Sequence, residues 1–172
     1  MRALLLLLPL AACSHAAMET GTPVAGGRLA TAPLIDGAGR AAGRATVREV
    51  AGGLRVTLDV RGLPAGTHGA HLHTVGSCTP PDFASAGPHW NPAGTKHGSM
   101  NPQGPHAGDL PNLLVGRDGR GTLGVVLAGA TMDALLDADG AAIVVHAAAD
   151  DLSTDPSGNS GARLACGVLV RG

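Results

Sequence analysis

Short stretches of the chain alternate apolar and polar residues with a period of two. Residues 46–50 and 55–60 both show this alternation, and a glycine-containing segment at 51–53 separates them. A period of two is typical of a strand that buries one face, and adjacent glycines favour a turn. We therefore predict two strands joined by a turn, inside a strand-like region that runs from residue 27 to residue 73.

The second half of the chain contains more short apolar stretches, which we also interpret as strands: 113–115, 121–127, 141–146 and 164–170. Residues 117–120 have the composition of a hairpin turn. Residues 74–111 and 147–162 lose all periodicity, and long segments of this kind are uncommon and usually functional. Since no stretch has convincing helical periodicity, we predict an all-β fold, a Greek-key antiparallel barrel or sandwich of about eight strands with two long functional loops.

Composition limits what this fold can do. The 172 residues suit one domain, and its core must be built from Ala, Val and Leu because Phe83 and Trp90 are the only Phe, Trp or Tyr residues. The formal net charge of −1 argues against a nucleic-acid binder, which needs a concentrated basic face. The scarcity of aromatic residues argues against base stacking, so we expect no nucleic-acid partner.

The N-terminus has the features of an export signal. Residues 1–12 contain one arginine, a run of leucines and then small residues, and the apolar run is shorter than the about 20 residues that cross a bilayer. Residues 10–13 resemble a bacterial lipobox, in which the signal is cleaved before a cysteine that receives a diacylglyceryl group. An ordinary secretory signal followed by a chance cysteine is the alternative.

The lipobox interpretation divides the chain into a signal peptide at 1–12, a lipid-anchored flexible tether at 13–27 and a folded domain at 28–172. Lipidated Cys13 would be the only membrane contact of an envelope lipoprotein that faces the periplasm or the cell surface. Cys78 and Cys166 remain. Two cysteines in an exported domain most often form a disulfide, and their alternative use is as metal ligands.

Histidine is the outlying residue type, with eight copies, and it directs attention to metal chemistry. His71 and His73 have i, i+2 spacing, which on a strand places both rings on one face, about 7 Å apart along the chain. Leu72 would then point into the core. His68 has the wrong offset for the face of the two rings, so we exclude it.

More candidate ligands follow the first pair. His89, His97, His106 and Asp109 lie in the first long loop, and three histidines with one carboxylate suit a four-coordinate borderline cation such as Zn²⁺. His146 ends a predicted strand, from which its side chain can reach a site built on a loop. A set of unrelated surface histidines is the alternative on composition alone.

Five segments that contain these residues resemble the copper–zinc superoxide dismutase family. They are 69–73, 85–92, 96–98, 106–110 and 158–168, and they occur in the family's order within a match from about residue 28 to 171. The resemblance implies an antiparallel β fold and an oxidoreductase that converts superoxide to dioxygen and hydrogen peroxide, in envelope antioxidant defence. It also implies copper and zinc as cofactors and the superoxide anion as substrate.

The resemblance implies ligands for each metal. Copper would be bound by four histidines: His71, His73, His89 and His146. Zinc would be bound by three histidines and a carboxylate: His89, His97, His106 and Asp109. His89 would bridge the two metals as an imidazolate, a state that two neighbouring cations favour, and would take up and deliver a proton in each cycle.

Four more residues receive roles from the resemblance. Arg163 would line the copper channel and dock superoxide, with the alternative that it bonds loop carbonyls as a structural residue. Asp150 would link a copper histidine to a zinc histidine, with a solvated loop acid as the alternative. Cys78 and Cys166 would form the family's intrasubunit disulfide.

The chain departs from the family in its loop charges. Residues 147–162 contain no lysine and are net negative, and Lys96 is the only basic residue nearby, so we predict a rate with weak salt dependence. The alternatives to an enzyme are a non-catalytic module that stores or transfers copper and an adhesive β-sandwich on a lipid anchor. All seven ligand positions and Arg163 are present, which favours the enzyme. A homodimer is compatible with the sequence, which has no readable interface motif.

Overall fold

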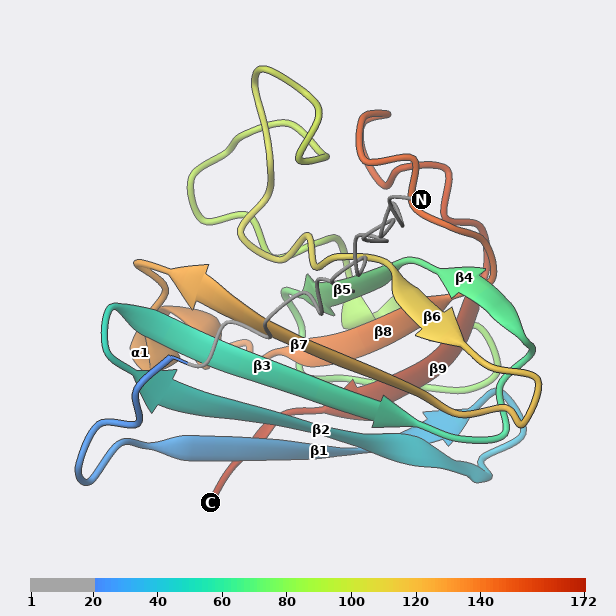
Figure 1. Cartoon of the computed structure of the whole chain (residues 1–172), viewed down its shortest axis with the longest axis horizontal. Helices are drawn as coiled ribbons and strands as arrows, with labels where there is room; N and C mark the ends of the chain where they lie inside the picture. The colour runs from blue at the N-terminus through green and yellow to red at the C-terminus, as the bar shows by residue number, and fades with distance from the viewer. Residues whose placement is uncertain (1–20) are drawn as a thin grey trace, which may run out of the picture.

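The computed structural model describes residues 21–172, so the predicted signal peptide at 1–12 and the predicted lipidation of Cys13 lie outside the described residues. The described chain is almost entirely strand and loop (Figure 1). Its elements are β1 (Leu29–Asp36), β2 (Ala41–Val50), β3 (Gly53–Val60), β4 (Gly66–His68), β5 (Ala70–His73), a 3-10 helix (Ala84–Ala86), β6 (Leu113–Val115), β7 (Gly121–Ala128), α1 (Met132–Leu135), β8 (Ala142–His146), β9 (Arg163–Val168) and β10 (Val170–Arg171). Within residues 21–172 no helix is long and apolar enough to cross a membrane.

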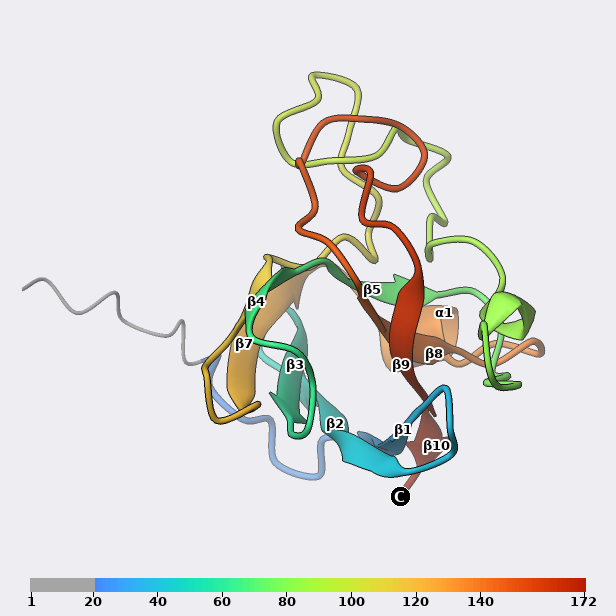
Figure 2. The same ribbon diagram turned by 90° about the vertical axis from the view of Figure 1, so that its right-hand side faces the viewer.

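Eight strands form the main antiparallel sheet, in the order β5-β8-β9-β1-β2-β3-β7, with β10 paired to β1. The sheet curls into a half-barrel, with β3 and β7 on one side and β8 and β9 on the other (Figure 2). Some neighbouring strands follow each other in sequence, such as β1, β2 and β3, whereas β3 and β7 or β5 and β8 are distant in sequence, and all the pairs are antiparallel. The all-β antiparallel prediction is therefore confirmed.

The predicted hairpin around residues 117–120 is wrong in its pairing. The turn itself is present, because the Gly116 N–H donates to the Arg120 carbonyl over 2.8 Å. However, β7 pairs with β3 along all eight of its residues, whereas β6 pairs with the three-residue strand β4 in a separate small sheet. The turn therefore connects strands of two different sheets instead of two strands that pair with each other.

The core lies inside the curve of the main sheet. On β3, Leu54, Val56 and Leu58 alternate with outward residues and are 0% exposed, as the period of two predicts. The neighbouring strands contribute mainly alanine and valine to the same core. One turn of helix, α1, which the sequence did not indicate, adds Met132 and Leu135 to this core.

Residues 21–27 were assigned to the flexible tether, but they pack against the end of β2. Pro23 forms a bridge with Val50, and the Ala51 N–H donates to the Thr22 carbonyl over 3.0 Å. The Gly27 N–H donates to the Val24 carbonyl over 2.9 Å. This segment therefore belongs to the folded domain, which begins before the predicted boundary at residue 28.

Two long loops rise from the same end of the half-barrel (Figures 1 and 2). They are the residues between β5 and β6 and those between β8 and β9, as predicted. A disulfide joins Cys78 of the first loop to Cys166 of β9 across 88 positions, so the disulfide prediction is confirmed. In the chain-entropy model, a disulfide that closes a loop of this length destabilises the unfolded state by roughly 4–5 kcal/mol.

Candidate metal centre

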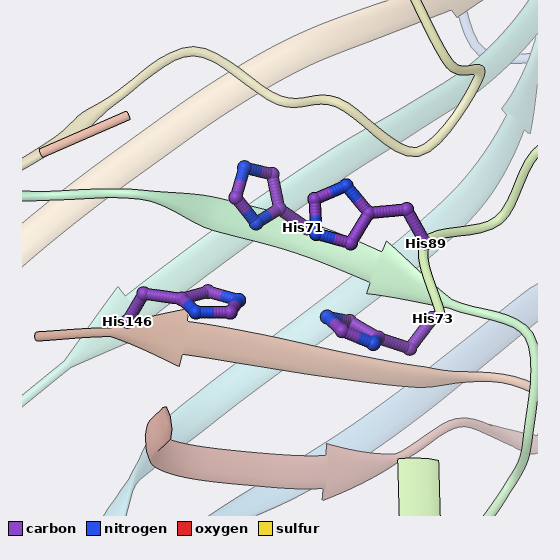
Figure 3. A group of neighbouring side chains, drawn as sticks. All are labelled: His71, His73, His89 and His146. Carbon is purple, nitrogen blue, oxygen red and sulfur yellow. The ribbon is translucent and has the colours of Figure 1, made fainter. Parts of the chain in front are cut away.

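Four histidines meet beside β5 and the end of β8. His71, His73, His89 and His146 each offer a ring nitrogen within 4.8 Å of the others, and we call them the four-histidine group. Figure 3 shows the four rings turned toward a common space, with His89 reaching in from the first long loop. Leu72 is 0% exposed and belongs to the core cluster, so the alternation predicted for this strand is confirmed.

The outer nitrogen of three of these rings is held by a hydrogen bond. His73 Nδ1 lies 2.8 Å from the Gly87 carbonyl oxygen, and His146 Nδ1 lies 3.3 Å from that of Gly161. His71 Nε2 lies 2.8 Å from Asp150 Oδ2. Because these oxygens accept, the three ring nitrogens donate, and this leaves the lone pair of each ring on its other nitrogen.

The nitrogens that carry those three lone pairs, together with Nε2 of His89, have no hydrogen-bond partner among the described residues. They are His71 Nδ1, His73 Nε2, His89 Nε2 and His146 Nε2, one from each member of the four-histidine group. Buried polar atoms without a partner are costly and rare. Four of them converging within one group fit a metal ion with imidazole ligands.

Burial keeps these rings neutral, which a metal ligand requires. Burial lowers the pKa of His73 to about 2, and the donated hydrogen bond to Gly87 only partly opposes this. Burial likewise lowers the pKa of His146 to about 3. The pKa of His71 is lowered for the same reason, although its bond to Asp150 opposes the change. At neutral pH the lone pairs of these three rings are therefore available.

A second group surrounds one carboxylate. His89, His97, His106 and Asp109 also offer donor atoms within 4.8 Å of one another, and we call them the mixed group. Asp109 Oδ1 lies 3.0 Å from His89 Nδ1 and 3.2 Å from His106 Nδ1. His97 Nδ1 lies 3.0 Å from the same oxygen but is not aligned for a hydrogen bond.

Asp109 stays ionised in this setting. Burial alone would raise the pKa of its carboxyl, but the hydrogen bond from His89 and the one from the Gly98 N–H outweigh burial and lower it. Asp109 Oδ2 accepts from the backbone N–H groups of Gly98 over 2.9 Å and of His106 over 3.0 Å. Three ring nitrogens and a fixed carboxylate are a donor set that suits Zn²⁺.

His89 belongs to both groups. Its Nδ1 faces Asp109, while its Nε2 is one of the four converging atoms of the four-histidine group. Its ring centroid lies 4.0 Å from that of His71 and 5.2 Å from that of His97. A single imidazole therefore presents one nitrogen to each group.

Asp150 forms a second link between the groups. Its Oδ2 lies 2.8 Å from His71 Nε2 and its Oδ1 lies 3.0 Å from His97 Nε2, and the side chain is 0% exposed. Burial would raise the pKa of Asp150, but the bonds from the two rings lower it, so the carboxylate is ionised. The solvated-acid alternative is therefore wrong.

Arg163 lies beside the four-histidine group at the start of β9. Its two terminal nitrogens donate to the carbonyls of Phe83 over 2.7 Å and Gly87 over 2.8 Å, which fixes the guanidinium. It lines a surface depression of about 610 Å³ together with Asp82, Pro88 and Gly161. The structural role expected as an alternative is thus present, and it leaves the guanidinium at the wall of an open depression.

Comparison with known proteins decides the family. The sequence pattern of the family described as copper/zinc superoxide dismutase matches residues 41–169. The chain belongs to the copper/zinc superoxide dismutase family. The resemblance found in the sequence is thereby confirmed, as are its class of oxidoreductase and the copper and zinc that the family uses.

Relatives support this family across most of the chain. A copper–zinc superoxide dismutase of Caulobacter vibrioides is 47% identical over 147 residues, which cover 81% of this chain and 84% of the relative. One from Deinococcus radiodurans is 40% identical over 178 residues, covering 95% and 93%. The crystal structure of a superoxide dismutase-like protein from Bacillus subtilis aligns with a TM-score of 0.77 at 40% identity, covering 81% of this chain and 97% of that one. The Brucella abortus enzyme aligns with a TM-score of 0.68 at 31% identity, covering 83% and 99%.

Some residues of this dismutase-family site escaped the sequence analysis. The side-chain amide of Asn112 holds Asp150 by two bonds of 2.8 Å, one to its carbonyl and one from its N–H. Gly158 has φ +62, and a Cβ there would lie 1.8 Å from Asp150 Oδ1, so only glycine leaves room for the carboxylate. No spacing or periodicity in the sequence marks either residue.

His68, excluded from the ligands, lies in neither donor group. It is buried, and its ring nitrogens lie 2.7 Å from the His146 carbonyl and 2.9 Å from the Pro64 carbonyl. Its position therefore supports the backbone at the end of β8, from which the His146 ring extends.

Proposed function

We propose that this chain is a superoxide dismutase that converts two superoxide anions and two protons to dioxygen and hydrogen peroxide. The single observation that supports this most strongly is the placement of His89, whose two ring nitrogens face two separate donor groups. One group offers only imidazole nitrogens and the other includes an ionised carboxylate, so the two sites suit different ions.

The four-histidine group would hold copper, and the mixed group would hold zinc. When bound, copper supplies a one-electron redox couple, and zinc, which has none, supplies a fixed positive charge. The residues themselves orient the donors: the Gly87 and Gly161 carbonyls fix His73 and His146, and Asp150 fixes His71 and His97. Such outer partners select the tautomer and the ring orientation of a ligand.

His89 is also placed to move a proton. Its Nε2 is buried and lacks a partner among the described residues, while Asp109 holds the ring through Nδ1. We infer that Nε2 takes up a proton in one half of the cycle and delivers it to the peroxide product in the other half. Because Nδ1 would stay with the mixed group throughout the cycle, the ring would keep its place while Nε2 changes its state.

Arg163 would dock the anion. Its guanidinium keeps a positive charge at the wall of the depression, and the two carbonyl bonds hold it in one orientation. Burial lowers its pKa, but from a starting value so high that the group remains charged at neutral pH. A fixed positive charge beside the four-histidine group holds a small anion in position for reaction.

The cellular setting is proposed from the sequence. The 1–12 signal and Cys13 favour export and a lipid anchor in the bacterial envelope, facing the periplasm or the cell surface. Antioxidant defence there would follow from the activity. The superoxide anion is the expected substrate, no nucleic-acid partner is expected, and a homodimer remains a prediction.

The experiment that tests this function compares metal-loaded protein with metal-free protein. We expect the loaded protein to inhibit superoxide-driven reduction of a dye, and metal analysis to find one copper and one zinc per chain. A protein that binds both metals and leaves dye reduction unchanged would be a copper store or carrier, and the proposal would then fail.

A further inference from the structure

Arginines gather on the outer face of β2 and β3. Arg44 and Arg48 alternate on β2 with the core residues Ala45 and Val47, so they point outward. Arg55 lies between the buried Leu54 and Val56 on β3 and also points outward. With Arg61 and Arg120 at the adjoining end, they form what we call the basic face: Arg44, Arg48, Arg55, Arg61 and Arg120.

Arg55 has an interaction partner of its own, whereas few carboxylates lie beside the other arginines of the basic face. Asp59 is the one acidic residue on the outward positions of β2 and β3, and it accepts a hydrogen bond from Thr122 over 2.9 Å. Arg117 and Asp118 in the adjoining turn add one charge of each sign. Without Arg55, the basic face and Asp59 have a formal charge of +3, in a chain whose formal total is −1. The net charge of the chain does not indicate this face, because the arginines come together only through the pairing register of β2 and β3.

The arrangement of these arginines suits phosphate groups. Arg44 and Arg48 lie on one face of β2, and Arg48 lies directly opposite Arg55 in the β2–β3 ladder. Arg44, Arg61 and Arg120 line a depression of about 590 Å³ together with Asp59. Guanidinium groups bind phosphate through paired hydrogen bonds.

The described chain begins on the same face. Val50 follows Arg48 by two positions on β2 and therefore points the same way, yet it is only 5% exposed. Gly21 covers it: a Cβ at Gly21 would lie 2.9 Å from Val50 Cγ2 and 3.2 Å from Val126 Cγ2. Val126 pairs with Arg55 in the β3–β7 ladder. Cys13 is eight positions before Gly21, a length that reaches at most about 28 Å when fully extended.

We propose that the basic face docks on the anionic lipid surface of the membrane that holds Cys13. The short distance from Cys13 keeps the face close to that surface, and each arginine near anionic lipid strengthens binding about five-fold. β8 and β9, which carry His146 and Arg163, lie across the half-barrel from β3 (Figure 2). Docking therefore leaves the depression beside Arg163 open to substrate. The proposal rests on the proposed lipid anchor but does not depend on dismutase activity.

A tryptophan reporter tests this on the full chain. The only native tryptophan, Trp90, is 5% exposed and lies in the first long loop. Thr46→Trp places a second one on the outer face of β2, between Arg44 and Arg48. Purified protein is reconstituted in vesicles of brominated phosphatidylcholine, with or without phosphatidylglycerol. We expect strong quenching of the reporter only with phosphatidylglycerol, and its reversal by salt.

Charge-reversed variants locate the contact. In the reporter background, Arg44→Glu/Arg48→Glu is expected to weaken docking at least about 25-fold. Arg40→Glu/Arg171→Glu is the matched control, since it changes net charge equally at side chains that are 80% and 52% exposed outside the basic face. This control should keep most of the quenching. Thr57→Trp, opposite Thr46 on β3, is a second reporter if the first fails to fold.

Several outcomes would overturn the proposal. Equal quenching in neutral and anionic vesicles would mean that the anchor alone holds the domain. Equal loss in both double variants would mean that total charge acts instead of this face. Binding of a soluble polyanion to the face without quenching in anionic vesicles would identify a different occupant. Dismutase activity, measured on every variant, should be unchanged, so failure of docking and failure of the proposed function remain distinguishable.

Discussion

The two donor groups are built in different ways. In the four-histidine group, three ligands come from the paired strands β5 and β8, and backbone carbonyls orient two of their rings. The members of the mixed group all lie in the first long loop, and their ring nitrogens surround one carboxylate oxygen. The strands thus position most of the four-histidine group, whose members are neutral, whereas the mixed group is organised around the ionised carboxylate of Asp109.

The second long loop supports the mixed group from outside. Asp155 accepts from the His97 N–H over 2.8 Å, and the Met100 N–H donates to the Leu152 carbonyl over 2.8 Å. Loop order and binding at the mixed group should therefore depend on each other, while the four-histidine group should depend on the loops less, because three of its ligands lie on strands. The loops reach the four-histidine group through His89, Asp150 and the carbonyls of Gly87 and Gly161.

The largest effect is expected for His89→Ala, which removes a ligand from both groups. Activity should fall by at least the order of 10²-fold that a positioned proton donor contributes, and both metals should bind more weakly. His106→Ala is the comparison variant, because it changes the mixed group alone and should lose zinc while copper stays. Metal analysis with an activity assay checks both. Retained copper and activity in His89→Ala would contradict the shared ring.

Arg163→Ala should lower activity roughly 10²-fold while both metals stay bound, because it removes the fixed charge and no metal ligand. Arg163→Lys should recover only part of the rate, since a lysine supplies charge without the fork that bonds the Phe83 and Gly87 carbonyls. Initial rates at equal metal content make the comparison. If both variants kept native kinetics, Arg163 would have no part in docking the anion.

Asp150→Asn should weaken metal binding about 10–100-fold, the usual cost of losing an outer partner of a ligand. We expect zinc to be affected more than copper, because the mixed group lacks the support of the sheet. Gly158→Ala should act similarly by displacing the same carboxylate. Asp139→Asn, at an exposed carboxylate outside both groups, is the control. Competition with a chelator measures both affinities, and an unchanged zinc affinity in Asp150→Asn would count against the link.

The metal-free protein should lose stability as the pH falls. His73 and His146 have a pKa of about 2 and about 3 in the folded state, against an ordinary value of 6.5, so below that value the unfolded chain binds more protons. Stability therefore decreases as the pH falls from about 6.5 toward 3. Urea unfolding of chelator-treated protein across this range gives the trend. A midpoint that stays constant or rises on acidification would show that these rings are not held neutral.

The smallest expected effect is that of salt on the rate. Lys96, the one lysine near the loops, pairs with Asp155 over 3.1 Å, so it offers little attraction to an anion. We expect the rate to change less than about two-fold between low and physiological salt. Pulse radiolysis at several ionic strengths is a suitable measurement. A steep decrease would mean that distant charges steer the substrate.

The sequence was sufficient to predict the metal-donor residues, but not the residues that hold those donors in place. The i, i+2 spacing of His71 and His73 predicts their shared face because strand geometry is local. The contacts of Asp150 with Asn112 and Gly158 connect loops with no periodicity, and Asn112 is 38 positions from its partner. Such contacts depend on tertiary loop placement, which no local pattern encodes.

The basic face and the strand pairing could not be predicted in full for the same reason. Alternation along β2 and β3 predicts that Arg44, Arg48 and Arg55 point outward, but only the ladder register places Arg48 opposite Arg55. The hairpin expected at residues 117–120 failed for a related reason, because strand partners are chosen over long distances in the chain. Residues 21–27 looked like a tether because their sequence has no apolar period, yet backbone bonds hold them on β2.

Anomalous diffraction at the copper and zinc edges, on crystals of the metal-loaded protein, tests the central claim most directly. We predict a copper peak beside Nε2 of His89 and a zinc peak beside Nδ1 of the same ring. Metals at two sites that do not share this ring, or a single metal on one side of it, would contradict the account.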